Sequence, residues 1–146
     1  MNAFDPKSVL LAKHAQHVVL IHFPIALCMV GATFDVLSER TKNASLAIVA
    51  YYNLLIAAIA AVPTVITGIL AWRFALEGAK LKGELLLHLL GGIAVALLML
   101  VVAWVHLRAR RAHVSPPKWR FALEGVTFAL LGLTAHLGGF LSGVNG

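Results

Sequence analysis

Four long apolar stretches divide this chain, and they limit the folds open to it more than any other feature. Each is close to the ~20 residues that a helix needs to cross the hydrocarbon core of a bilayer. The stretches cover residues 18–37, 46–72, 85–107 and 121–141. With 60% hydrophobic and only 12% charged residues, a chain of 146 residues cannot hide this apolar surface as a water-soluble domain. The sequence therefore predicts an integral membrane protein.

Short polar segments separate the four stretches. They cover residues 38–45, 73–84 and 108–120, and the last contains the helix breaker Pro116-Pro117. Connections this short favour antiparallel neighbours. We therefore predict an all-α, up-down four-helix bundle that forms one domain over residues 1–146. The first stretch is too long for a cleaved signal peptide and contains His22, so we expect it to be a membrane helix.

Lysine and arginine residues are distributed unequally between the two sides of this bundle. The N-terminal arm and the second connection carry five, namely Lys7, Lys13, Arg73, Lys80 and Lys82. The first and third connections carry seven, namely Arg40, Lys42, Arg108, Arg110, Arg111, Lys118 and Arg120. The excess predicts that both termini lie outside, facing the periplasm of a bacterial inner membrane. Because membrane topology accounts for the net charge of +6, we expect lipid and no nucleic acid as partners.

Three histidines lie within the apolar stretches: His22, His88 and His136. At ~1.5 Å of rise per residue, antiparallel helices place all three roughly 5 to 8 Å below the same surface, the one that we expect to face outward. Ionisable side chains inside membrane helices are costly and usually face the bundle interior, so each is a candidate for a functional site. We expect them to bind a cofactor or metal in preference to making only interhelical hydrogen bonds.

Glycines flank two of these histidines at helical spacing, three or four residues away: Gly91, Gly92, Gly132 and Gly139. Missing side chains beside an imidazole leave a flat slot. A porphyrin held edge-on between helices needs such a slot, with an imidazole on each side of the iron. Glycine is also common in membrane helices because it allows close packing, and taken alone these four favour that explanation.

The other histidines have less specific positions. His17 precedes His22 by five residues, which turns it about 140° away on a helix, so the two are not expected to bind one ion. We interpret His17 as interfacial and solvated, or alternatively as a ligand of a second centre. The remaining three are interpreted as surface residues: His14, His106 and His113.

No catalytic spacing is evident in the sequence. Asp35, Glu84 and Glu124 are isolated near the predicted helix ends, where a solvated or capping role is the default. Neither a Ser-His-Asp arrangement nor a carboxylate pair occurs, so we do not expect an enzyme on its own. The single cysteine, Cys28, excludes an internal disulfide and is interpreted as a small core residue.

One heptapeptide, Trp-Arg-Phe-Ala-Leu-Glu-Gly, occurs twice, at residues 72–78 and 119–125. It looks like a duplication. The first copy follows the second apolar stretch on the outer side, whereas the second copy precedes the fourth stretch on the inner side. The copies are therefore not topologically equivalent, and we assign them no function.

Sequence motifs at both ends of the chain resemble a known family. The opening motif runs from His17 through His22-Phe23-Pro24 to Leu27, and the closing motif runs from His136 to Gly143. Together with Asp35 and His88, they resemble the small bacterial four-helix membrane proteins catalogued as domain of unknown function 2231. The likeness covers nearly the whole chain, although Val18 stands where a proline commonly follows the first histidine. The resemblance implies a four-helix membrane domain often found near redox modules, with no assigned activity.

We therefore interpret the chain as a b-type haem subunit that passes electrons between a periplasmic carrier and a larger membrane redox complex. The first choice of axial ligands is His88 and His136, with His22 as an alternative ligand or part of a second centre. The basic side chains expected to neutralise the haem propionates are Arg73, Lys80 and Lys82.

Two alternatives stay open at this stage. In the first, the histidines form a nitrogen set for copper or zinc, made of His22, His88 and His136, with His17 as a further candidate. In the second, the chain is a structural subunit that binds no cofactor and packs against a partner in a membrane complex.

Overall fold

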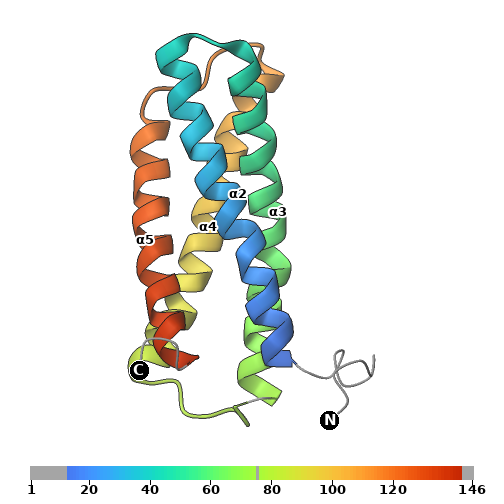
Figure 1. Cartoon of the computed structure of the whole chain (residues 1–146), viewed down its shortest axis with the longest axis vertical. Coiled ribbons are helices and arrows are strands. Elements are labelled where there is room, and N and C mark those ends of the chain that lie inside the picture. The colour runs from blue at the N-terminus through green and yellow to red at the C-terminus, as the bar shows by residue number, and fades with distance from the viewer. Residues whose placement is uncertain (1–12, 75, 143–146) are drawn as a thin grey trace.

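The chain folds into four long helices, each antiparallel to the next (Figure 1). The computed structural model describes residues 13–74 and 76–142. In chain order the helices are α2 (Lys13–Thr41), α3 (Ala44–Phe74), α4 (Gly83–Arg111) and α5 (Arg120–Leu141). All four are long and apolar enough to cross a membrane. The prediction of an all-α membrane bundle of four helices is therefore confirmed.

The helices extend beyond most of the apolar stretches that predicted them. α2 covers Lys13–Thr41, whereas its apolar stretch covers residues 18–37. Long polar side chains at a membrane surface bury their stems and keep their charged ends in water, so a helix continues past its apolar core. The connections are correspondingly short, and only Lys42 and Asn43 separate α2 from α3.

The bundle has two ends that differ in chemistry. The beginning of α2 and the end of α5 lie at one end, together with the α3–α4 connection, and we call this the terminal end (Figure 1). The α2–α3 and α4–α5 connections lie at the other end, which we call the arginine end after Arg108, Arg110, Arg111 and Arg120. The three histidines singled out above belong to the terminal end, as the depth argument predicts.

Small residues allow α2 and α3 to pack closely. Ala57, Ala58 and Ala61 of α3 are almost fully buried in the core. On α2, a Cβ added at Gly31 would lie 2.8 Å from Cγ of Leu54, so this position accommodates nothing larger than glycine without a shift. Small residues at helix contacts are how membrane helices approach without a hydrophobic driving force. This pair of helices is the most extensively packed in the bundle.

The four faces of the bundle are not closed equally. α3 packs against α4, and α4 against α5, whereas α2 and α5 make few contacts with each other. Large apolar side chains point outward along every helix, among them Val19, Ile59, Leu97 and Leu133. Such exposure suits contact with lipid chains, which is the surrounding that the four membrane-spanning helices imply.

Aromatic side chains and arginines pair at the arginine end. The guanidinium carbon of Arg110 lies 4.8 Å from the ring centre of Tyr51 and 5.6 Å from that of Tyr52. Arg108 lies 5.3 Å from the ring centre of Trp104. Amphipathic aromatic rings and basic side chains are typical of the headgroup level of a bilayer, which places the membrane surface at this end near these residues.

Candidate functional site

Two histidines from different helices meet at the terminal end. His17 of α2 and His88 of α4 have their ring centres 6.5 Å apart, with the ring planes at 80° to each other. Both side chains are half-buried. Because α2 and α4 are not sequential neighbours in the bundle, this contact crosses its interior.

Helix α3 orients the ring of His17. Its Nδ1 lies 3.1 Å from the carbonyl oxygen of Thr64 and 3.3 Å from Oγ1 of Thr67. The Thr67 hydroxyl is itself within donating distance of the carbonyls of Pro63 and Thr64, so its oxygen can accept. A carbonyl oxygen only accepts, and Nδ1 of His17 therefore carries the proton. In the neutral ring this leaves the lone pair on Nε2.

Helix α5 orients His88 in the same way. Nδ1 of His88 lies 3.0 Å from the carbonyl oxygen of Thr134 and donates to it. Metal-binding histidines commonly donate their other ring N–H to a carbonyl or carboxylate, which fixes the ring and raises its basicity as a ligand. Both rings of the pair thus have the hydrogen-bond arrangement that a ligating imidazole needs.

Glycines from the two remaining helices lie against these rings. A Cβ added at Gly138 of α5 would be 2.9 Å from Cε1 of His88. A Cβ added at Gly68 of α3 would be 3.0 Å from Cε1 of His17. Glycine at both positions gives each imidazole the space that it occupies, so all four helices contribute to the His17–His88 pair.

His22 and His136 lie at the predicted level but are exposed. Nδ1 of His22 donates to the carbonyl of Val18, one turn earlier on its own helix, at 2.7 Å. The ring of His136 packs edge-on against Phe140, with the ring centres 4.9 Å apart. Depth along the helices was therefore predicted well, whereas the direction of these side chains around the helix axes was not. The structure brings the ring of His17 to that of His88, whereas the side chains of His22 and His136 are exposed.

The glycines predicted to form a slot have mixed surroundings. Gly91 packs against Thr134, whose Oγ1 would lie 2.6 Å from a Cβ at this position. Gly92 and Gly132 face open space within 4 Å. Gly139 is half-buried in the last turn of α5. Gly91 thus lets α4 approach α5 beside His88, and neither Gly92 nor Gly132 is placed against an imidazole.

The basic residues predicted to neutralise propionates lie at the terminal end. Arg73 is exposed in the last turn of α3. Lys80 and Lys82 are exposed in the α3–α4 connection. These three residues bring positive charge to the terminal end, where the acidic Glu77 and Glu84 are also exposed.

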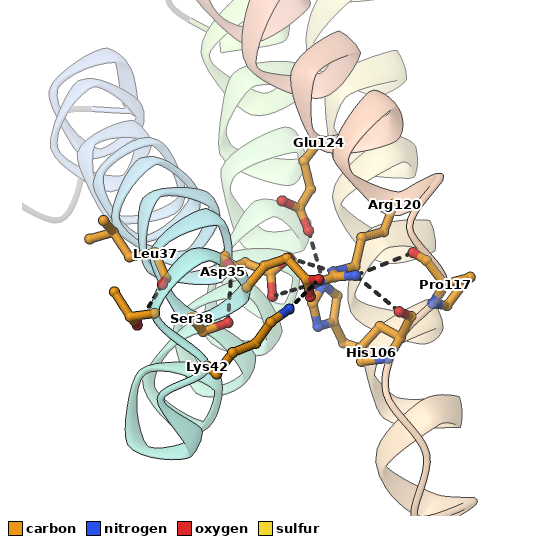
Figure 2. Close-up of polar contacts among 11 residues, drawn as sticks. Asp35, Leu37, Ser38, Lys42, His106, Pro117, Arg120 and Glu124 are labelled. Atoms are coloured by element: carbon orange, nitrogen blue, oxygen red, sulfur yellow. Dashed lines mark hydrogen bonds and ion pairs between the residues drawn. The ribbon is translucent and has the colours of Figure 1, made fainter.

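A second polar site lies at the arginine end and is more deeply buried (Figure 2). Nε of Arg120 donates to Oδ2 of Asp35 at 2.5 Å, and both side chains are 4% exposed. The same guanidinium donates to the carbonyl oxygens of Pro116 and Pro117 and lies 3.4 Å from Oε2 of Glu39. This ion pair joins α2 to α5, which otherwise contact each other little.

His106 and Glu124 form the second half of this site (Figure 2). Nε2 of His106 and Oε1 of Glu124 share a hydrogen bond of 2.9 Å, and both side chains are 4% exposed. The expectation that His106 is a surface residue, and that Asp35 and Glu124 are solvated, is therefore wrong. On its own helix, each of these residues would be exposed to solvent. In the bundle, the polar side chains of the other helices face it, and all of them are buried.

The two sites differ as potential metal sites. Within the described part of the chain, one group of three side chains could hold a metal ion. It consists of Asp35, His106 and Glu124, whose ligand atoms lie within 4.8 Å of one another. The predicted set of His22, His88 and His136 does not form such a group there. The His17–His88 pair accordingly offers two nitrogen ligands and no third ligand from the described residues.

Comparison with known proteins places the chain in a family. A family model described as Predicted membrane protein (DUF2231) matches residues 13–146. The chain belongs to this family. The resemblance seen in its opening and closing motifs is thus confirmed. No curated protein and no solved structure matches the chain. Membership in the family supports a membrane protein and carries no activity with it.

Sequence reasoning missed the residues that position the histidine pair. Gly68 and Thr64 lie about two and three turns before the end of α3 and so belong to the level of His17, which was a usable signal. Gly138 lies next to Gly139 in the closing motif, and only the rotation of α5 decides which of them faces His88. That rotation depends on packing between helices and is not readable from the spacing alone.

Proposed function

We propose that this protein is a b-type haem subunit of a membrane redox complex, with His17 and His88 as the axial ligands. The observation that carries the proposal is the His17–His88 pair itself: two half-buried imidazoles from different helices, each oriented through Nδ1 by a backbone carbonyl. This ligand pair differs from the sequence-based choice of His88 and His136, because His136 is exposed on α5.

The separation of the two rings fits one iron between them. Metal–imidazole bonds of about 2 Å, with about 1.2 Å from nitrogen to ring centre, give roughly 6.4 Å between the ring centres on either side of a metal. The observed distance is 6.5 Å. Near-perpendicular ring planes are compatible with two axial ligands, since each ring rotates about its own bond to the metal.

The number of ligands favours haem over a copper or zinc ion. Zinc sites use three or four protein ligands, and copper sites use a comparable set. A haem iron already has four porphyrin nitrogens and needs only two axial ligands, which the pair supplies.

The chain's own residues have defined tasks in this proposal. His17 and His88 bind the iron, Thr64 and Thr134 orient the two rings, and Arg73 with the lysines of the α3–α4 connection provides positive charge for the propionates. Bound haem would supply one-electron transfer. The apolar outer surface keeps the subunit in the bilayer, where a membrane complex can accept or deliver the electron.

The proposed orientation places the haem near the periplasmic side of a bacterial inner membrane. Arg120, one of the seven basic residues counted for the inner side, is buried and paired with Asp35. The exposed basic residues on that side are therefore Arg40, Lys42 and those of residues 108–118. Single cysteines in a Cys28→Ala background test this orientation in intact cells. An impermeant thiol reagent should label a cysteine at Lys80 and spare one at Lys118, and the reverse pattern contradicts the orientation.

Visible spectroscopy of the purified chain tests the haem. The wild-type protein, produced with adequate haem supply, should show a Soret band and a low-spin reduced-minus-oxidised spectrum. His88→Ala should remove the six-coordinate low-spin signature, and His113→Ala, at an exposed histidine of the arginine end, is the matched control. A colourless wild-type protein that stays colourless after haem addition contradicts the proposal and leaves a metal or structural role.

A further inference from the structure

The buried site at the arginine end is not electrically balanced. Asp35 and Glu124 bring two negative charges when both are ionised, and Arg120 brings one positive charge. All three side chains, and that of His106 beside them, are 3 to 5% exposed. One negative charge therefore remains inside the bundle without a compensating cation.

Among the described residues, no lysine or arginine other than Arg120 makes an ion pair with Asp35 or Glu124. Glu39 of α2 lies 3.4 Å from Arg120, but it is itself paired at 2.9 Å with Lys42 at the surface. On α3 the charged residue is Arg73, at the terminal end, and the two tyrosines of this helix, Tyr51 and Tyr52, pack against Arg110 of α4. The core residue Cys28 of α2 is a further titratable neighbour, which interacts electrostatically with Glu124.

One carboxylate oxygen of the site has no partner. Oε1 of Glu124 bonds to His106, whereas Oε2 is buried and has no hydrogen-bond partner in the described structure. An ionised carboxylate with an unsatisfied oxygen in an apolar interior is expensive, and such groups usually take up a proton instead. A protonated carboxyl avoids most of this cost, since its second oxygen is then an ordinary carbonyl.

We propose that the His106–Glu124 pair is a proton-binding site that takes up one proton per chain from the aqueous phase at the arginine end. The proton lies in the hydrogen bond between Glu124 Oε1 and His106 Nε2, and it makes the site as a whole electrically neutral. The site lies about 6 to 9 Å, four to six residues, below the ends of α2, α4 and α5, so a proton reaches it from the headgroup level.

A proton fits this site better than a metal ion does. The ligand atoms of Asp35, His106 and Glu124 are close enough to surround an ion, yet the carboxylate of Asp35 already binds the guanidinium of Arg120. A divalent cation would lie beside that positive charge and would leave the site with an excess positive charge. A single proton restores neutrality and leaves both hydrogen-bonded pairs in place.

Infrared spectroscopy of the full chain in lipid vesicles tests this inference, and haem binding is not needed for it. At neutral pH the infrared spectrum of the wild type should show one protonated carboxylic acid per chain. If the proton is on His106 instead, ¹⁵N-labelled protein should show the signature of an imidazolium. Glu124→Gln should remove that signal. The matched control is Glu77→Gln, because Glu77 occupies the equivalent position of the repeated heptapeptide and is exposed.

A second variant tests the charge balance itself. Asp35→Asn removes one negative charge, so Arg120 then neutralises Glu124 and the bound proton should be released, from one per chain to none. If Asp35→Asn does not fold, loss of the signal in Glu124→Gln still tests the inference. Two results would overturn the inference: an ionised Glu124 beside a neutral His106 in the wild type, or a stoichiometric divalent metal in the purified chain that disappears in Glu124→Gln.

Discussion

The same seven residues occur at opposite ends of this bundle with different structures. In the first copy, residues 72–78, the helix ends at Phe74, and Glu77 and Gly78 adopt left-handed backbone angles, with φ of 51° and 66°. In the second copy, residues 119–125, the chain is helical from its second residue onward. Local sequence therefore does not decide the backbone of this heptapeptide.

Burial differs between the copies as much as the backbone does. Arg73 and Glu77 are exposed, whereas the equivalent Arg120 and Glu124 are 3% and 5% exposed. The apolar run of α3 precedes the first copy and that of α5 follows the second, so opposite ends of the heptapeptide enter the bilayer. Position relative to the apolar run, together with Asp35 on a neighbouring helix, converts a surface arginine into a buried one.

The largest effect should come from the arginine of the second copy. Arg120→Gln leaves Asp35 buried without its partner, and breaking a buried ion pair on one side costs about 3–5 kcal/mol. Arg73→Gln should change the free energy of unfolding by no more than about 0.5 kcal/mol, since Arg73 is exposed. Unfolding titrations with SDS in mixed micelles measure both values. Equal effects of the two substitutions would show that burial of Arg120 contributes nothing.

A smaller effect is expected at the terminal end, where glycines and imidazoles meet. A Cβ at Gly138 would lie 2.9 Å from the ring of His88, so Gly138→Ala should displace that ring and cost about 1–3 kcal/mol. Gly132→Ala, on the same helix in open space, is the control and should be neutral or slightly stabilising. Haem occupancy should fall in Gly138→Ala alone. If both variants lose haem equally, Gly138 has no particular role beside His88.

The smallest effects, of opposite sign, are expected at the final glycine of the two copies. Gly78→Ala introduces a Cβ at φ of 66° and should destabilise the protein by about 1–2 kcal/mol. Gly125→Ala lies inside α5 with nothing within 4 Å and should stabilise it by about 0.5–1 kcal/mol. Thermal unfolding in one detergent compares the two. The same sign at both positions would contradict the difference in backbone between the copies.

The fold was predictable because its causes are local in sequence. Four apolar runs of sufficient length require four helices in a bilayer, and connections as short as Lys42-Asn43 require antiparallel neighbours. Helix ends were placed less well, since polar residues such as Lys13 and Arg111 continue helices beyond the apolar core. Hydropathy reports the thickness of the hydrocarbon and not the length of a helix.

The candidate site was predictable in depth but not in direction. Counting residues placed His22, His88 and His136 at one level, and the structure has all three toward the terminal end. His17 was interpreted as interfacial, or as a ligand of a second centre. Which of them face inward depends on the rotation of each helix, and the spacing between His17 and His22 shows only that they cannot both face one point. The buried charges were missed for a related reason, because Asp35, His106 and Arg120 become a cluster only when three helices are assembled.

The assignment of His17 and His88 as a haem-binding pair is the central claim, and spectra of two histidine variants test it most directly. His17→Ala removes an imidazole whose ring centre lies 6.5 Å from that of His88, whereas His136→Ala removes an exposed imidazole of α5. The reduced-minus-oxidised spectrum of His17→Ala should lose its low-spin, six-coordinate form, whereas His136→Ala should retain it. A low-spin spectrum that survives in His17→Ala and disappears in His136→Ala would contradict the assignment.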